Sequence, residues 1–392
     1  MAKALIGGVG MAPFSRPSEG KAYPAMVRDA VTAALADAGV DYGAIQQAYA
    51  GYVYGDSTSG QRALYPLGLT GIPVINVNNN CATGSTALHL AIEAVKHGAA
   101  ECVLAVGFEQ MNAGALASHF TDREDPLGPH LTVMQMVQGR SEAPFAAQLF
   151  GGAGREYMEK YGAEPSTFAR IATKARAHAA HNPYAVFRAP VTLEEIMASP
   201  SVFEPLTRLQ CCPPTSGAAA AIVASPAFAA RHGMNRAVPV LAQALVSDRN
   251  ESFEDGMAAL VGAHMTRAAA DVVYAAAGID PTDLDVVELH DCFTANELIT
   301  YEGLRLTPTG TAERFILDGH NSFGGKVVTN PSGGLLSKGH PLGATGLAQC
   351  AELVWQMRGD AERRQVEGAR LALQHNLGLG GACIVTLYGR PH

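Results

Sequence analysis

Two stretches of this sequence share one order of features: NVNNNCATGSTALHLAIEAVKHG at residues 76–98 and SKGHPLGATGLAQCAELVWQMRG at residues 337–359. In each, a reactive side chain (Cys81 or His340) precedes Ala-Thr-Gly and the apolar periodicity of a helix. A strand pattern follows each helix. Strand, helix and strand therefore alternate in both parts of the chain, which predicts an α/β fold with a largely parallel sheet.

An earlier pair of segments supports this duplication. Residues 25–39 (AMVRDAVTAALADAG) and 266–278 (TRAAADVVYAAAG) have helical periodicity and stop at glycine, the preferred residue just past a helix end. Each is followed by Val-Asp or Ile-Asp and then a strand pattern. Two equivalent halves would bring corresponding helix N-termini together at a pseudo-twofold axis.

The periodicity weakens between the two halves, where Pro, Gly, Met, His and aromatic residues are mixed. We expect an inserted loop domain at residues 113–206 that lies over the sheet and shapes a ligand pocket. The N-terminal half would then comprise residues 1–112 and 207–235. The C-terminal half would comprise residues 236–392.

The composition narrows the class of protein. Of 392 residues, 48% are hydrophobic and 16% charged, which is typical of a globular chain with a large core. A net charge of −8 argues against a nucleic-acid surface, and no apolar stretch approaches the ~20 residues of a membrane span. Glycines interrupt the short apolar run of the start, MAKALIGGVGMAPF. It therefore reads as a first strand and turn and not as a signal peptide. Seven cysteines without a secretion signal indicate reduced thiols and a cytoplasmic location.

Cys81 is a candidate nucleophile. Unpaired backbone N–H groups and the positive end of a helix dipole stabilise a thiolate, so we expect a lowered pKa for this thiol. Three asparagines just before it add hydrogen-bonding groups at the same point. The alternative is a buried structural cysteine, since buried thiols are common.

His340 has the equivalent position in the second half. The glycine-rich approach GGLLSKG lets backbone come close to a ligand, and Pro341 fixes the chain as it enters the helix. A histidine there is placed to take a proton from a thiol across the pseudo-twofold axis. Alone, it is equally well a loop histidine held by a backbone carbonyl.

The stretch ELHDCF (residues 288–293) ends a strand of the second half, where α/β folds place their sites. Alternation along a strand would put His290 and Cys292 on one side and turn Asp291 away as a structural anchor. Zinc usually needs about four ligands in paired spacings, so we expect no metal. An imidazole N–H beside a thiol suits an oxyanion donor and a general acid/base. Core packing is the alternative.

Together, NNNCATGSTAL, ELHDCF, NPSGGLLSKGHPLGATGLAQCAEL and LQHNLGLGGA resemble the thiolases of the sterol carrier protein X (SCP2-thiolase) type. The resemblance runs from the N-terminal strand to the final Tyr-Gly. It implies a thiolase fold of two pseudo-equivalent βαβαβαββ halves, with a loop domain in the first, assembled as a homodimer or homotetramer. The lipid-transfer domain of the animal protein is expected to be absent, which makes a separate lipid-binding protein a candidate partner.

The resemblance also implies a reaction. The family cleaves 3-oxoacyl-CoA with CoA to acetyl-CoA or propionyl-CoA and a shortened acyl-CoA, as in fatty acid β-oxidation. CoA and acyl-CoA are substrates, and no cofactor is permanently bound. Cys81 would attack the 3-keto carbon and His340 would take its proton. His290 would donate to the enolate oxygen, and Cys292 would protonate the enolate and then deprotonate CoA.

The glycines of LQHNLGLGG expose backbone N–H groups. By the same resemblance, the N–H of Cys81 and one from Gly378 or Gly380 would hold the tetrahedral oxyanion, although a tight turn between strands explains these glycines equally well. Commoner thiolases carry an acid/base cysteine here, in a Cys-x-Gly motif, and its absence moves that role to Cys292.

One segment departs from the family pattern. CCPPTSGAAA (residues 211–220) lacks the aspartate of Cys-Cys-Pro-Thr-Ser-Asp-Gly-Ala-Ala and has an added proline, which leaves the shape of the pocket open. Its adjacent cysteines lack C-x-x-C spacing, so we expect buried thiols.

Other functions fit the same fold. A thiolase-fold aldolase needs no nucleophilic cysteine, so Cys81 argues against it. A biosynthetic condensing enzyme shares the mechanism, so the residues do not give the direction of the reaction. A non-catalytic acyl-CoA or lipid-binding partner protein would need no such set of reactive side chains. Chain length, branching and sterol-derived substrates stay open.

Overall fold

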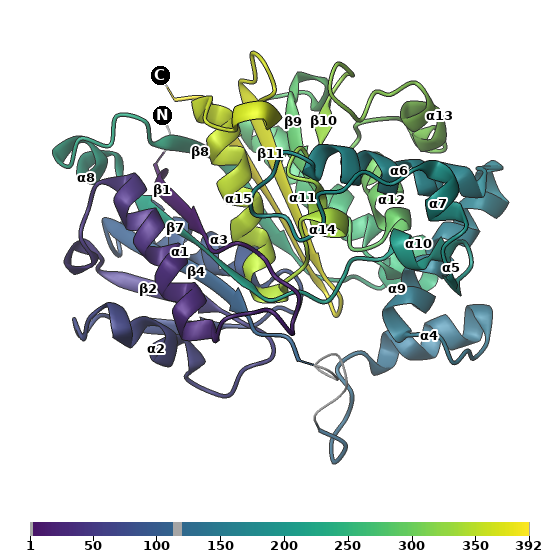
Figure 1. Cartoon of the computed structure of the whole chain (residues 1–392), viewed down its shortest axis with the longest axis horizontal. Helices are drawn as coiled ribbons and strands as arrows, with labels where there is room; N and C mark the ends of the chain where they lie inside the picture. The colour runs from purple at the N-terminus through teal and green to yellow at the C-terminus, as the bar shows by residue number, and fades with distance from the viewer. Residues whose placement is uncertain (1–2, 113–119, 392) are drawn as a thin grey trace.

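The computed structural model describes residues 3–112 and 120–391, and a ten-stranded sheet runs through it (Figure 1). The first part of the chain contributes β1 (Leu5–Met11), β2 (Gln47–Gly51), β3 (Val74–Val77), β4 (Cys102–Glu109) and β7 (Gly217–Ala224). The second part contributes β8 (Val238–Val246), β9 (Val286–Glu288), β10 (Val328–Thr329), β11 (Leu371–Gly378) and β12 (Ala382–Gly389). The expected N-terminal strand is thus confirmed.

The two groups of strands have the same order in space, β3-β2-β4-β7-β1 and β10-β9-β11-β12-β8. In each group the first two pairings between neighbouring strands are parallel and the last two pairings are antiparallel. The predicted duplication is therefore confirmed. The prediction of a largely parallel sheet is wrong, because the sheet is mixed. A tight turn joins β11 to β12, and strands joined in this way can pair only antiparallel.

The two halves meet along β1 and β8, which pair antiparallel at Leu5↔Pro239 and Ile6↔Val238. Helix α3 (Thr83–Lys96) packs on α15 (Leu342–Arg358), and α15 also contacts β4, β7 and β11. Both helices therefore lie between the halves (Figure 1). Helices α1 (Tyr23–Ala38) and α11 (Ala263–Ala277) cover β1 and β8, and both end, as expected, at a left-handed glycine.

The repeated Ala-Thr-Gly motifs bring the N-termini of α3 and α15 together. A Cβ on Gly84 would lie 2.6 Å from the carbonyl oxygen of Gly343, and one on Gly346 would lie 2.1 Å from Ser85 Oγ. Only glycine permits so close an approach of the two backbones. The predicted meeting of corresponding helix starts is confirmed.

The segment between β4 and β7 is helical where the sequence suggested loops. Its described part forms α4 (Gly128–Gln138), α5 (Phe145–Tyr161), α6 (Pro165–Ala179), α7 (Leu193–Met197) and a hairpin of β5 (Ser201–Phe203) and β6 (Leu206–Thr207). This segment is inserted between two strands of the first half but packs on the second half. There, α5 and α6 contact α12 (Thr294–Gly303). Residues 113–119, at the start of the expected domain, lie outside the described residues, and the domain boundaries stay predictions.

Shorter helices complete the described chain: α2 (Ser59–Leu64), α8 (Pro226–Arg231), α9 (Glu251–Glu254), α10 (Met257–Leu260), α13 (Ala312–Leu317) and α14 (Gly334–Ser337). Across residues 3–112 and 120–391, no helix combines the length and apolar character needed to cross a bilayer.

Candidate active site

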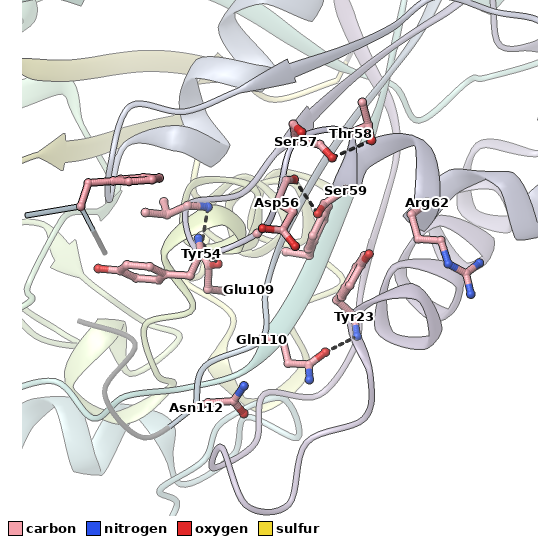
Figure 2. A pocket seen from close by; sticks show the side chains of 14 residues that line it. Tyr23, Tyr54, Asp56, Ser57, Thr58, Ser59, Arg62, Glu109, Gln110 and Asn112 are labelled. Atoms are coloured by element: carbon pink, nitrogen blue, oxygen red, sulfur yellow. Dashed lines mark hydrogen bonds between the residues drawn. The ribbon is translucent and has the colours of Figure 1, made fainter. Parts of the chain in front are cut away.

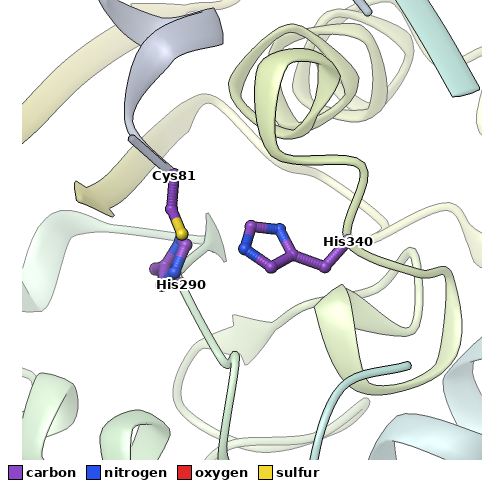
Figure 3. A group of neighbouring side chains, drawn as sticks. All are labelled: Cys81, His290 and His340. Atoms are coloured by element: carbon purple, nitrogen blue, oxygen red, sulfur yellow. The ribbon is translucent and has the colours of Figure 1, made fainter. Parts of the chain in front are cut away.

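Three of the predicted residues converge at the starts of α3 and α15. Cys81 precedes α3, His290 follows β9 and His340 precedes α15. One sulfur or nitrogen atom of each lies within 4.8 Å of one such atom of the other two (Figure 3). The rings of His290 and His340 stand edge to face, with their centroids 5.1 Å apart. Segments far apart in the sequence thus place a thiol and two imidazoles at one point.

A tight turn presents Cys81. Asn80 has a left-handed backbone (φ 50°), a conformation that asparagine tolerates better than most residues, and the N–H of Ala82 donates to Asn79 O at 3.1 Å. The side-chain amide of Asn80 donates to Leu379 O at 3.1 Å in the β11–β12 turn. The asparagines therefore brace the loop of the thiol.

The prediction of a lowered pKa for Cys81 is wrong. Burial raises the pKa of this thiol to about 12, and the Glu109 carboxylate adds to the shift. Its Sγ also donates to Asn80 Oδ1 at 3.5 Å, which favours the protonated form. Desolvation here exceeds the stabilisation available from the helix start. The resting side chain is therefore a protonated thiol.

The hydrogen bonds of His340 leave one of its ring nitrogens able to accept a proton. The hydroxyl of Thr345 donates to Pro341 O at 3.0 Å, and this uses its single hydrogen. The same hydroxyl lies 2.7 Å from His340 Nδ1 and must therefore accept a hydrogen bond from it. Because burial lowers the pKa of His340 to about 3, the ring is neutral and its Nε2 carries a lone pair. This Nε2 is buried without a hydrogen-bond partner among the described residues, and a ring nitrogen of His340 faces Cys81 and His290 in Figure 3.

The ELHDCF stretch differs from its predicted geometry. Strand β9 ends at Glu288, so residues 289–292 have no strand alternation. Asp291 nevertheless points away and accepts from the backbone N–H groups of Leu335 (2.7 Å) and Leu336 (3.4 Å), which agrees with the expected structural anchor.

Cys292 lies outside the three-residue cluster but near it. The residue is 4% exposed. Burial raises the pKa of its thiol well above the ordinary value, and the neighbouring thiols of Cys212 and Cys81 add to the shift. Like Cys81, it is protonated at rest and can first act as an acid.

The CCPPTSGAAA segment passes directly beside the site. The N–H of Cys212 donates to Cys292 O at 2.9 Å, and Thr215 Oγ1 accepts from the His340 N–H at 3.2 Å. Cys211 and Cys212 are half-buried free thiols, so the prediction of buried thiols is wrong for both.

Both predicted oxyanion glycines lie at the β11–β12 turn. Gly378 ends β11 and packs so closely on the Cys81 loop that a Cβ there would lie 2.3 Å from Asn79 O. Gly380 has φ 92° at the turn itself, near Leu127. The structure thus brings Gly378 against the Cys81 loop, and the oxyanion roles of the two glycines stay predictions.

Three neighbours of the site were missed from the sequence: Thr345, Asn376 and Glu109. Asn376 donates through Nδ2 to Cys81 O at 3.2 Å, and the same nitrogen lies 2.9 Å from His290 Nδ1. Thr345 lies in the repeated Ala-Thr-Gly, and Asn376 in the LQHNLG stretch that was read for its glycines. Their positions were therefore visible, although their partners were not.

Glu109 ends the otherwise apolar strand β4, a signal that could have revealed it. Its carboxylate accepts from the N–H groups of Val53 (3.1 Å), Tyr54 (2.9 Å) and Gly343 (3.0 Å), and burial raises its pKa to about 7. It also lines a cavity of about 600 Å³ whose wall includes Asp56 (Figure 2). This carboxylate therefore lies on the wall of that cavity and near enough to Cys81 to raise the pKa of its thiol.

The cluster contains side chains of the kinds that can bind a metal ion. Thiolate sulfur and imidazole nitrogen are both zinc-binding atoms. Among the described residues, this is the group of His, Cys, Asp and Glu side chains that is close enough to hold an ion. The expectation of no metal rested on the lack of paired spacings along the sequence, whereas this cluster is assembled from three separate segments, and the expectation stays a prediction.

Comparison with protein families gives two matches that cover most of the chain. The profile of the thiolase N-terminal domain matches residues 9–227, and the thiolase C-terminal domain-like profile matches residues 249–387. Sterol carrier protein 2 of Gallus gallus is 56% identical over 390 residues, covering 98% of this chain and 71% of that protein. Non-specific lipid-transfer protein-like 2 of Caenorhabditis elegans is 43% identical, covering 98% and 96%.

Solved structures share the fold. The Ltp2-ChsH2(DUF35) aldolase superposes with a TM-score of 0.84 at 26% identity, covering 100% of this chain and 98% of that chain. Human mitochondrial 3-ketoacyl-CoA thiolase in complex with CoA superposes with a TM-score of 0.74 at 18% identity, covering 99% and 98%.

Proposed function

Since the chain belongs to the thiolase family and is an acyltransferase enzyme, we propose that it cleaves a 3-oxoacyl-CoA with CoA through an acyl-enzyme on Cys81. The observation that carries the proposal is the convergence of Cys81, His290 and His340 within 4.8 Å. A nucleophile, its base and a hydrogen-bond donor are what cleavage of a carbon–carbon bond next to a thioester requires.

Acylation begins with the thiol of Cys81. As its sulfur attacks the 3-keto carbon, the proton moves to the Nε2 lone pair of His340, because a thiol of raised pKa is a poor nucleophile until the proton leaves. The keto oxygen becomes an oxyanion, for which the backbone N–H groups of Cys81 and of Gly378 or Gly380 are the proposed donors.

Collapse of this intermediate breaks the bond between C2 and C3. The acyl group stays on Cys81, and the electron pair leaves as the enolate of the acyl-CoA product. His290, neutral in its buried site, keeps one ring N–H for the enolate oxygen, and the Cys292 thiol protonates the carbon.

CoA then completes the cycle. The Cys292 thiolate takes the proton of the CoA thiol, and the CoA sulfur attacks the acyl-enzyme. Cys81 leaves as a thiolate and recovers its proton from His340. Each thiol and imidazole returns to its starting state, so the cycle needs no metal ion, oxidant or permanently bound cofactor.

The similarity to sterol carrier protein 2 supports a role in lipid metabolism, with branched or sterol-derived 3-oxoacyl-CoAs as candidate substrates. Acetyl-CoA or propionyl-CoA would be the released product. A homodimer or homotetramer, a lipid-binding partner protein and a cytoplasmic location stay predictions from the sequence.

Aldol cleavage is the second candidate, since the Ltp2-ChsH2(DUF35) aldolase superposes well on this chain. Breaking a 3-hydroxyacyl-CoA by that route needs a base and an enolate donor but no acyl-enzyme. The thiol of Cys81 therefore favours thiolysis.

The test compares Cys81→Ser with the matched control Cys211→Ser, a half-buried free cysteine whose Sγ donates to Thr207 O. CoA-dependent cleavage is measured on straight, 2-methyl and sterol-derived 3-oxoacyl-CoAs. Mass spectrometry of enzyme mixed with substrate alone detects acyl-Cys81. Cys81→Ser should lose thiolysis and the adduct, whereas the control should keep both. Thiolysis by Cys81→Ser at near wild-type rate would refute the proposal, and cleavage of 3-hydroxyacyl-CoA alone would favour the aldolase.

For the proton-transfer step, Cys292→Ala is the variant of interest. It should still form acyl-Cys81 slowly but turn over poorly, because the enolate then lacks its acid. Unchanged turnover would remove Cys292 from the mechanism.

A further inference from the structure

One amide group links the nucleophile loop to His290. Asn376 Nδ2 donates to Cys81 O at 3.2 Å and lies 2.9 Å from His290 Nδ1. An amide nitrogen has two N–H donors and accepts no hydrogen bond. His290 Nδ1 must therefore accept, and the proton of the neutral ring lies on Nε2.

The orientation of this amide is determined by its surroundings. The carbonyl oxygen of Cys81 can only accept, so the amide must turn an N–H toward it. On the other side, Asn376 Oδ1 accepts from the Ser85 hydroxyl at 2.8 Å. Ser85 Oγ in turn accepts from Gln374 Nε2 at 2.7 Å, and the Tyr388 hydroxyl donates to Gln374 Oε1 at 2.5 Å. A buried chain of donors and acceptors from β12 to α3 thus holds the amide one way round.

We propose that Asn376 is a positioning residue that keeps the His290 proton on Nε2, so that the ring presents a donor to the enolate oxygen. This role in catalysis rests on the proposed thiolase function, whereas the tautomer itself does not. Asn376 acts through His290 and need not touch the substrate.

The tautomer matters because His290 is neutral. Burial lowers the pKa of His290 well below its ordinary value, and the nearby imidazoles of His340 and His375 lower it further. A neutral ring has only one N–H, so a proton on Nδ1 would turn a lone pair toward the enolate oxygen. The negative oxygen would then meet an acceptor instead of a donor.

The two catalytic imidazoles consequently have opposite tautomers. Thr345 accepts from His340 Nδ1, which leaves a lone pair on Nε2, whereas Asn376 donates to His290 Nδ1, which leaves a proton on Nε2. One ring is a base and the other a donor, although both are buried and uncharged. The same arrangement disfavours a metal ion, because His290 Nε2 cannot ligate while it carries a proton.

The decisive variant is Asn376→Asp, which keeps the shape but replaces the N–H groups with an acceptor. Because burial keeps the ring neutral, His290 must then shift its single proton from Nε2 to Nδ1 to donate to the carboxylate. The matched control is Asn182→Asp, since Asn182 is also buried and its Nδ2 donates to a backbone carbonyl, that of Ser332, at 2.8 Å.

The first measurement is ¹⁵N NMR of the resting protein with labelled histidine, in which His290 is assigned by loss of its signals in His290→Gln. The wild type and Asn182→Asp should show unprotonated Nδ1 and protonated Nε2, and Asn376→Asp should show protonated Nδ1. A wild-type His290 protonated on Nδ1 would overturn the proposal whatever reaction the enzyme catalyses.

The second measurement is exchange of the α-protons of acetyl-CoA in D₂O, which reports enolate formation without acyl transfer. Asn376→Asp should slow this exchange and lower kcat by roughly 10²- to 10³-fold, the usual loss for one oxyanion donor, with little change in KM. Asn182→Asp should leave both close to wild type. Wild-type exchange by Asn376→Asp would also overturn the proposal. Failure of the wild type to cleave any 3-oxoacyl-CoA would instead count against the proposed function.

Discussion

The contact between Gly378 and the Cys81 loop gives a sharp prediction for Gly378→Ala. The added Cβ would lie 2.3 Å from Asn79 O and 3.0 Å from Ala82 N. These two atoms form the hydrogen bond that closes the turn around Cys81. The substitution therefore pushes on the loop that carries Cys81.

The magnitude follows from that distance. Carbon–oxygen contacts begin at about 3.3 Å, so the loop and β11 must separate by about 1 Å. Overpacking of this kind costs roughly 1–3 kcal/mol of stability. A displacement of about 1 Å at reacting atoms costs on the order of 10²-fold in rate. We expect a folded protein with a slightly lowered Tm and a kcat reduced by about two orders of magnitude.

The assay is thiolysis of a 3-oxoacyl-CoA, alongside thermal unfolding. Gly43→Ala is the control, because a Cβ there meets nothing within 4 Å and the backbone is not left-handed. Wild-type kcat and Tm for Gly378→Ala would show that the turn yields without moving Cys81, and the reasoning would be wrong. A large loss of Tm with normal kcat would locate the strain elsewhere.

Three further predictions concern buried polar partners. Thr345→Val leaves the Nδ1–H of His340 without an acceptor, and an unsatisfied buried donor costs about 1–3 kcal/mol. If this cost is added to the activation barrier, kcat should fall roughly 5- to 150-fold, and Thr345→Ser should restore it. Burial lowers the pKa of His375 to about 3, so the folded ring stays neutral while the unfolded one protonates below pH ~6.5. The free energy of unfolding therefore decreases as the pH falls from 6.5 toward 3. Between pH 6.5 and 5, urea unfolding should show that His375→Gln loses roughly 2 kcal/mol less of this free energy than the wild type. Equal losses in the two proteins would contradict this. Lys174→Met leaves the buried Glu297 carboxylate without its cationic partner, so the free energy of unfolding in urea should fall by about 3–5 kcal/mol. The double variant Lys174→Met/Glu297→Leu should recover part of this loss, and an undiminished loss would contradict the pairing.

The Lys174 pair also explains how the inserted segment is held. Helix α6 carries Lys174 and α12 carries Glu297, just after the ELHDCF stretch. Lys174 Nζ also donates to Thr329 Oγ1 at 2.6 Å. The insertion is thereby anchored to the half of the molecule that supplies His290 and Cys292.

Local pattern was enough to predict much of this protein. Helix periodicity and terminal glycines located α1, α3, α11 and α15 and showed the duplication, because these signals depend on neighbours in the chain. The same reasoning put Cys81 and His340 at equivalent helix starts. Their convergence then follows from two halves of equal topology.

The tertiary structure alone decided the protonation states of the side chains in the candidate active site. The pKa of Cys81 depends on desolvation and on Glu109, 28 positions along the chain (109 − 81), and these outweigh the helix start that the sequence displays. The ring protons of His340 and His290 depend on Thr345 and Asn376, whose partners appear only when the halves meet. Spacing along a chain shows which reactive groups are present. Burial and the direction of each hydrogen bond, which arise from contacts across the fold, determine which of them is the acid, the base or the donor.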